Sequence, residues 1–373
     1  MGGGLMALMT GRERILSALR GEEVDRIPWV PLIVPYTIAG LSQSVPHMVV
    51  ETLDYFGCDI FPRGSGDIFA VQLPKSDSRI TPFLKYVDGD QVTGYITPEG
   101  TIAARWRSIG YGAMTGPVEY LIKTIDDLKA YRYFLQNMVY YYADLSDHFE
   151  FEQSIVGDKG VLCDAGIGFT PIQYFLEMLC GVENTYYLMS DAPELFDEVM
   201  DMMHQNNKAM LAHIARNSKA EVFSHQENTS STTMSPAIFE RYCLSQLNEY
   251  SKIFHNEGKL HVIHMCGKLK KLSHLIAKCE CDAITDIAPA PAGDTELWEA
   301  KALFGGKLVT GGIGTDTFIN STPEQCYESG AEILKKLKGS RGISLGSGDS
   351  VPYGTSAENL FAFRQAVLDF GCY

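Results

Sequence analysis

The fold is decided by the stretch Leu260-His261-Val262-Ile263-His264-Met265-Cys266-Gly267. Its apolar first half predicts a buried β-strand, and its last residues include an imidazole and a thiol, which can bind a metal. A short buried strand that ends in such residues is typical of parallel sheets, where chemistry gathers at the carboxyl ends of the strands. Similar strands should therefore recur on both sides of it.

Short apolar runs of this kind do recur, and helical stretches separate them. Eight strands are predicted, at 27–33, 58–61, 160–164, 221–226, 260–265, 282–287, 308–312 and 342–345. The clearest helices between them are 235–257, 268–278, 294–304 and 323–338. Eight alternating units predict an α/β fold, a (β/α)8 TIM barrel with parallel strands. The alternative, an open doubly wound sheet, is disfavoured because no Gly-x-Gly-x-x-Gly follows an early strand.

One region departs from the barrel pattern. Residues 86–107 alternate around an Asp88-Gly89 turn, which predicts a small antiparallel β insertion. Residues 124–152 and 171–217 are predicted to be helical. Because no low-complexity linker interrupts the chain, residues 1–373 are expected to form a single barrel domain.

Composition excludes several kinds of partner. The chain has 31 Lys and Arg against 46 Asp and Glu, a net charge of -15 that repels phosphate backbones, so we expect no nucleic-acid partner. No basic amphipathic run and no membrane-spanning apolar run is present, so we expect no membrane association. Nine irregularly spaced cysteines and the absence of a signal peptide predict a cytoplasmic protein whose thiols are mostly buried.

The end of the quoted strand predicts a metal site. Side chains alternate along a strand, so His264 and Cys266 point to the same side with Cα atoms about 6.5 Å apart. An imidazole and a thiolate suit Zn²⁺. A rival ligand pair, Cys279 and Cys281, follows a helix of about ten residues, which carries the chain roughly 15 Å to the opposite face. We therefore expect this pair to be structural.

A third zinc ligand is expected at the same rim of the barrel. Asp349 follows the last strand, in a glycine-containing loop that can bend towards the metal. The alternative role for Asp349 is to cap the helix near residue 356. Glu227 is a second candidate for the third ligand, or an acid/base.

Other polar or small residues also follow predicted strands. The catalytic candidates are Glu227, His225 and Asp286. The substrate-binding candidates are Trp29, Tyr36, Asp164, Gly311 and Gly312. The two aromatic residues suit a methoxylated aromatic ring, and the bare backbone of the two glycines would let a ligand approach closely.

Several segments resemble the uroporphyrinogen-decarboxylase-like superfamily. They are Thr10 to Ile15, Asp25 to Pro28, Thr97 to Thr101, Met234 to Pro236, Gly311 to Ile313, and Glu358 to Leu360. The most specific one, His264-x-Cys266-Gly267, is similar to the zinc motif of the methylcobalamin:thiol methyltransferases of that superfamily. The resemblance implies a barrel fold, a zinc ion and a partner protein that carries a corrinoid.

Two departures from the superfamily bear on function. Asp349 stands where the thiol methyltransferases have a third-ligand cysteine, and a harder oxygen ligand argues against a thiol as the methyl acceptor. The decarboxylases carry an Arg-Gln-Ala-Gly-Arg segment after the first strand, whereas residues 34–40 here contain no arginine. A tetrapyrrole carboxylate would therefore lack its clamp.

We therefore expect a zinc-dependent methyltransferase. It would move a methyl group between a small methylated substrate, of the methoxylated aromatic, methylamine or thiol type, and a corrinoid. The chain lacks an Asp-x-His-x-x-Gly cobalamin signature, so the corrinoid should come on a partner protein. The alternatives are a tetrapyrrole decarboxylase of the uroporphyrinogen type, a methylcorrinoid:thiol or tetrahydrofolate methyltransferase, and a non-catalytic protein with a closed four-ligand zinc site.

Overall fold

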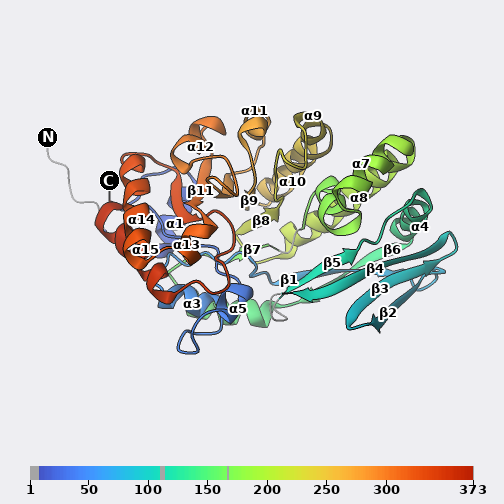
Figure 1. Cartoon of the computed structure of the whole chain (residues 1–373), viewed down its shortest axis with the longest axis horizontal. Helices are drawn as coiled ribbons and strands as arrows, with labels where there is room; N and C mark the ends of the chain where they lie inside the picture. The colour runs from blue at the N-terminus through green and yellow to red at the C-terminus, as the bar shows by residue number, and fades with distance from the viewer. Residues whose placement is uncertain (1–7, 110–113, 166–167, 373) are drawn as a thin grey trace.

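The computed structural model describes residues 8–109, 114–165 and 168–372. Its centre is a parallel sheet of six strands in the order β12-β11-β10-β9-β8-β7 (Figure 1). The strands are β7 (Cys163–Asp164), β8 (Val222–Gln226), β9 (Leu260–His264), β10 (Ala283–Ile287), β11 (Leu308–Ile313) and β12 (Ile343–Ser347). These are the last six of the eight strands that the sequence predicts.

Two extended segments carry this sheet around into a barrel. The segment at Trp29 forms a parallel bridge with Leu345 of β12, and the segment at Ile60 forms a parallel bridge with Gly160, just before β7. The two segments are joined by the amide of Asp59, which donates to the carbonyl of Trp29 at 2.9 Å. These are the first two predicted strands, so the predicted TIM barrel is confirmed.

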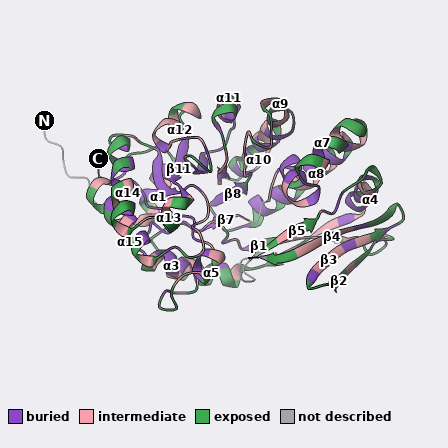
Figure 2. Ribbon diagram, in the orientation of Figure 1, coloured by how far each residue is buried: buried purple, intermediate pink, exposed green. Residues whose placement is uncertain are grey.

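Alternation along the strands separates the inside of the barrel from the outside. Ile15 and Leu19 of α1 (Gly11–Leu19) pack against the apolar side chains of the barrel interior. These interior side chains are Val30, Phe61, Val161, Val222, Val262, Ala283 and Leu308. The residues of opposite parity face the surrounding helices and form the larger core. The strands of the barrel are mostly buried (Figure 2). This parity decides which polar residues can reach the barrel interior.

The antiparallel insertion is larger than predicted. It is a four-stranded sheet of β2 (Thr81–Val87), β3 (Asp90–Thr97), β4 (Gly100–Ile109) and β5 (Met114–Glu119). A second antiparallel pair joins β1 (Ile68–Pro74) to β6 (Met138–Asp144). Both lie to one side of the barrel, below α4 (Ile125–Gln136) and α8 (Pro193–Asn217) in the view of Figure 1.

The prediction of one helix over 124–152 is wrong. α4 ends at Gln136, β6 follows, and α5 (Ser146–Val156) begins only after it. The segment Val139-Tyr140-Tyr141-Tyr142 favours a strand because β-branched and aromatic side chains pack well on a pleated surface. Its partner β1 is distant in the sequence. The nearest paired residues, Pro74 and Met138, are 64 positions apart. Local periodicity therefore gives no sign of this pairing.

The remaining helices fall mostly within the predicted stretches, except for two short ones at Pro35–Ala39 and Thr315–Asn320. They are α2 (Pro35–Ala39), α3 (Val49–Tyr55), α6 (Pro171–Tyr174), the π-helix η1 (Phe175–Leu179), α7 (Val182–Asp191), α9 (Pro236–Phe239), the π-helix η2 (Glu240–Leu244), α10 (Ser245–Asn256), the 3-10 helix η3 (Lys270–Leu272), α11 (Ser273–Ile276), α12 (Leu297–Leu303), α13 (Thr315–Asn320), α14 (Pro323–Leu337) and α15 (Ala357–Phe370). Among the described residues, none of these helices combines the length and the apolarity needed to cross a bilayer.

Candidate metal centre

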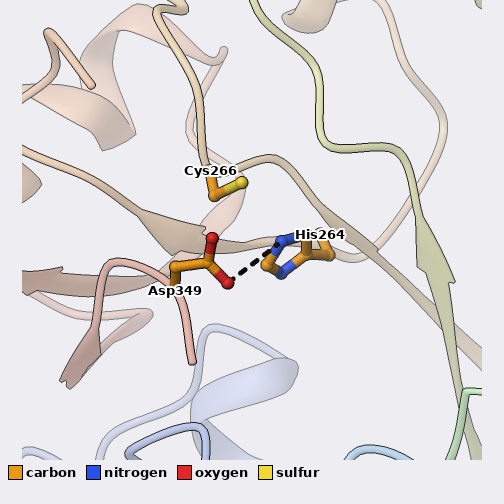
Figure 3. Close-up of side chains that lie close together, drawn as sticks. All are labelled: His264, Cys266 and Asp349. Carbon is orange, nitrogen blue, oxygen red and sulfur yellow. Dashed lines mark ion pairs between the residues drawn. The ribbon is translucent and has the colours of Figure 1, made fainter. Parts of the chain in front are cut away.

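Three side chains that could bind one metal ion meet at the carboxyl end of the barrel. His264 is the last residue of β9, Cys266 lies two residues further on, and Asp349 follows β12 (Figure 3). One ligand atom of each lies within 4.8 Å of the other two, and His264 Nε2 is 4.0 Å from Asp349 Oδ1. Within the described part of the chain this is the only such cluster of three or more His, Cys, Asp and Glu residues.

The orientation of His264 is fixed from behind by a carboxylate. Asp286 Oδ2 lies 2.8 Å from Nδ1 of His264, which leaves Nε2 facing Asp349. The other oxygen of Asp286 accepts a hydrogen bond from Arg63 at 2.6 Å. Burial alone would lower the pKa of His264, but its bond to Asp286 and the nearby Cys266 hold that pKa well above the ordinary value. A carboxylate behind a ligating imidazole is the usual arrangement at metal sites.

Asp286 reaches His264 through an irregularity in β10. The register of β10 against β11 shifts between Ile284 and Ile287, and Asp286 has a left-handed φ of 64°. Strict alternation would turn this residue away from the interior, and a bulge re-aims a side chain in this way. The structure therefore places Asp286 behind His264, so the expected catalytic Asp286 is better described as a positioning residue.

Cys266 is held by a chain of polar contacts that the sequence did not reveal. Its Sγ lies 3.8 Å from Oδ1 of Asn228, whose amide nitrogen donates to Glu177 at 2.8 Å. Gln173 donates to the other oxygen of Glu177 at 2.6 Å. Burial raises the pKa of Cys266, His264 opposes that shift, and Asp349 adds to it; burial also raises the pKa of Glu177. The thiol is therefore partnered and protonated in the metal-free protein.

The three residues suit a zinc ion. Nitrogen, sulfur and oxygen donors at about 2.0–2.3 Å from the metal would be roughly 3.5 Å apart in a tetrahedron. The observed separations are longer, at 4.0 Å between His264 Nε2 and Asp349 Oδ1 and up to 4.8 Å within the cluster, so a bound metal would draw the side chains together. Asp349 has the freedom for this because its side chain is 49% exposed, against 8% for His264. Three protein ligands leave the fourth position open, as at catalytic zinc sites.

Asp349 does not cap the following helix. The residue at the N-terminus of α15 is Ser356, whose side chain accepts a hydrogen bond from the amide of Asn359. Asp349 instead accepts from the amide of its neighbour Ser350 at 2.6 Å. The alternative role for Asp349 is therefore excluded.

Cys279 and Cys281 lie outside the cluster. Both are almost completely buried, at 3% and 6% exposure, and burial raises the pKa of Cys279 to about 12. Neither belongs to the group of described side chains that could hold one metal ion together with His264. This placement agrees with a structural role for both.

His225 and Glu227 do not face the metal-ligand cluster. The His225 ring stacks on Tyr250 of α10 with centroids 5.3 Å apart, so it lies outside the barrel. Glu227 accepts hydrogen bonds from the amide and hydroxyl of Thr170 and lies 3.3 Å from His225. Neither side chain is exposed to solvent. Both residues have the parity of β8 that faces the helices, and the cluster of possible metal ligands among the described residues does not include Glu227.

The expected substrate-binding residues lie in different parts of the structure. Tyr36 packs against Tyr353, with centroids 5.5 Å apart, in the loop that also carries Asp349, so it remains a candidate contact. Trp29 packs against Phe363 of α15, outside the barrel, and belongs to the core. Asp164 ends β7 and is 2% exposed.

Gly311 and Gly312 are required for packing rather than for ligand approach. A Cβ on Gly311 would lie 2.4 Å from the amide nitrogen of Ile287, and one on Gly312 would lie 2.8 Å from the side chain of Leu297. Both glycines also have positive φ angles, 122° and 97°, which other residues rarely adopt. From the sequence, a glycine at the end of a strand could serve either close packing or the approach of a ligand.

Comparison with known proteins agrees with this architecture. No curated protein matches the sequence significantly. A methyltransferase from Methanosarcina mazei has a similar structure, with a TM-score of 0.62 and 14% identity over 97% of this chain and 99% of that one. An endo-1,4-beta-mannanase from Rhizomucor miehei aligns over 92% of this chain and 95% of its own, with 11% identity and a low TM-score of 0.44.

The family is decided by the sequence itself. The profile of the uroporphyrinogen decarboxylase (URO-D) family matches residues 165–370, more than half of the chain and five of its last six barrel strands. The match includes His264, Cys266 and Asp349. The chain therefore belongs to the uroporphyrinogen decarboxylase (URO-D) family.

Proposed function

We propose that this protein is a zinc-dependent methyltransferase that moves a methyl group between a small methylated substrate and the corrinoid of a partner protein. The observation that carries the proposal is the trio of His264, Cys266 and Asp349 at the carboxyl end of the barrel. The structural likeness to a methyltransferase supports the same reading at the level of the fold. A decarboxylase of tetrapyrroles is disfavoured, because residues 34–40 contain no arginine that could hold the substrate's carboxylates.

The chain itself would prepare the site for the metal. Asp286 holds Nδ1 of His264, so that Nε2 is the nitrogen left for coordination. The carbonyl oxygen of Asn228 accepts a hydrogen bond from the thiol of Cys266. The amide nitrogen of Asn228 donates to Glu177, which fixes the orientation of Asn228. The side chain of Asp349 is far more exposed than that of His264. When bound there, zinc would polarise the heteroatom that carries the methyl group.

The mixed ligand set favours one direction of transfer. One thiolate and one carboxylate donate less electron density to a metal than two thiolates do. Such a site is better suited to an oxygen or nitrogen leaving group than to a soft thiol. We therefore propose that the enzyme demethylates a small ether or amine and transfers the methyl group to the corrinoid.

An activity assay tests this proposal. The purified protein is incubated with reduced cobalamin and methyl ethers or methylamines, and formation of methylcobalamin is followed by its absorbance. We expect methyl transfer by the wild type and at least a hundredfold loss in Cys266→Ala, because the leaving group is no longer polarised. Cys279→Ala, a matched change at a buried thiol outside the cluster, should retain activity.

Two outcomes would count against the proposal. Equal activity in Cys266→Ala and the wild type would exclude the metal from the reaction. Faster methylation of a thiol from methylcobalamin than demethylation of any ether or amine would reverse the proposed direction.

A further inference from the structure

A cavity lies outside the barrel, where the β1–β6 pair and α4 meet α6 and α8. It has a volume of about 230 Å³, and its lining comes from both parts of the chain. The β1–β6 pair contributes Gln72 and Tyr140, α4 contributes Tyr131, and the barrel contributes Phe169, Tyr174 and residues of α8. For comparison, an engineered protein cavity of about 150 Å³ holds a benzene molecule. The cavity therefore has room for one substituted aromatic ring.

The lining of this cavity is aromatic and polar but carries no charge. None of its twelve described lining residues is Asp, Glu, Lys, Arg or His. Three tyrosines, Tyr131, Tyr140 and Tyr174, line it. Burial raises the pKa of Tyr140 to about 12 and raises those of the other two, so all three hydroxyls stay protonated and able to donate.

Carboxamides complete the polar side of the cavity. Asn207 donates to the carbonyl of Phe169 at 3.3 Å, which fixes its orientation. Asn206, one residue earlier on α8, and Gln72 on β1 also line the cavity. Leu135, Met203 and Met210 supply apolar surface against which a ring can pack. A buried ion would find no counter-charge here, whereas a neutral ring with hydroxyl groups would find several partners.

We infer that this cavity is an accessory binding site for an uncharged aromatic ring that carries hydroxyl groups. The helical segment of α6 and η1 connects it to the metal-ligand cluster. Tyr174 of α6 lines the cavity, while its neighbour Gln173 donates to Glu177, which holds Asn228 beside Cys266. The inference stands on this geometry and does not depend on the proposed methyl transfer.

Calorimetric titration with resorcinol tests the site directly. We expect a dissociation constant tighter than about 1 mM for the wild type. Tyr140→Phe should weaken binding roughly two- to tenfold, as the loss of one hydrogen bond does. Met203→Trp, which fills the cavity, should abolish binding while a thermal melt shows that the protein remains folded. Tyr187→Phe removes the hydroxyl of an exposed tyrosine on α7 and should leave binding unchanged.

Further probes separate this site from the metal centre and from other ligand classes. Cys266→Ala should bind resorcinol within about twofold of the wild type, since its change lies elsewhere; loss of binding there would place the ligand at the metal centre and overturn the inference. Benzoate and phenyltrimethylammonium should each bind at least about tenfold more weakly than resorcinol. Tighter binding of either ion, or unchanged binding in Tyr140→Phe and Met203→Trp, would also overturn it.

Discussion

The role of each residue at the metal centre follows from its exposure and its partners. His264 is buried and bonded to Asp286, Cys266 is partly buried beside Asn228, and Asp349 is half exposed. Two ligands are thus preorganised and the third is free to adjust. Such a division lets a site bind its metal firmly while one ligand accommodates a substrate.

Asp349 is the ligand whose replacement is most informative. Asp349→Ala should weaken zinc binding by about tenfold or more, because two protein ligands cannot hold the metal tightly. Asp349→Cys should keep zinc bound, because a thiolate can take the same position. Competition with a zinc chelator measures both affinities. Unchanged affinity in Asp349→Ala would remove Asp349 from the ligand set.

Zinc binding should depend steeply on pH. In the metal-free protein the pKa of His264 is raised well above its ordinary value, and the pKa of Cys266 is raised as well. Both groups therefore hold a proton near neutral pH, and both must lose it to bind zinc. The apparent affinity should rise about tenfold per pH unit for each proton released, over the range below these raised pKa values. Chelator competition at several pH values, together with proton release in weak buffer, measures this; an affinity that stays flat would contradict it.

At the scale of the elements, parity along the strands decides which of the predicted site residues lie together. His264 and Cys266 were predicted together because alternation puts them on one side of β9. The same rule, applied to β8, turns His225 and Glu227 towards α10 and away from the cluster. Parity was predictable once Val222 and Val262 were known to face the interior, and only the structure shows that.

Other parts of the site had no signal in the sequence. The bulge that turns Asp286 towards His264 depends on the shifted pairing of β10 with β11. Glu177 lies on a π-helix and meets Asn228, 51 residues away, only through the fold. Arg63 crosses from the second strand to β10 in the same manner. The eight strands, by contrast, were predictable because each is a short apolar run bounded by helices.

The segment between β9 and β10 provides a test of the excluded cysteines. Cys279→Ala combined with Cys281→Ala should leave the zinc content close to that of the wild type. The double variant should lose stability, by roughly 1–2 kcal/mol for each buried thiol removed, through lost packing. Metal analysis and chemical denaturation measure the two effects. Loss of zinc would instead return these cysteines to the ligand set.

At the scale of the whole molecule, a buried ionic network ties the start of the chain to the barrel. Asp59 accepts hydrogen bonds from Arg14 on α1 at 2.5 Å, from Arg26 at 2.7 Å and from the amide of Trp29 at 2.8 Å. Its side chain is only 2% exposed. The network lies between the first two barrel segments, where the sheet is joined by few backbone hydrogen bonds.

Breaking this network should destabilise the entire barrel. Asp59→Ala leaves the buried guanidinium of Arg14 and the partly buried one of Arg26 short of a partner, and it should lower the free energy of unfolding by roughly 3 kcal/mol. Asp54→Ala is the matched control, because Asp54 forms an exposed ion pair with Lys159 and should cost less than about 1 kcal/mol. Denaturant titration of both variants measures the difference. Equal effects would show that the network contributes no more than a surface pair.

The central claim is that His264, Cys266 and Asp349 hold one zinc ion. The most direct measurement is the zinc content of the purified wild-type protein and of Cys266→Ala, determined by elemental analysis after both are prepared with the same zinc supply. We expect about one zinc per chain in the wild type and almost none in the variant, because Cys266 supplies the only thiolate of the cluster. Full zinc occupancy in Cys266→Ala, or a metal-free wild type under zinc saturation, would contradict the account.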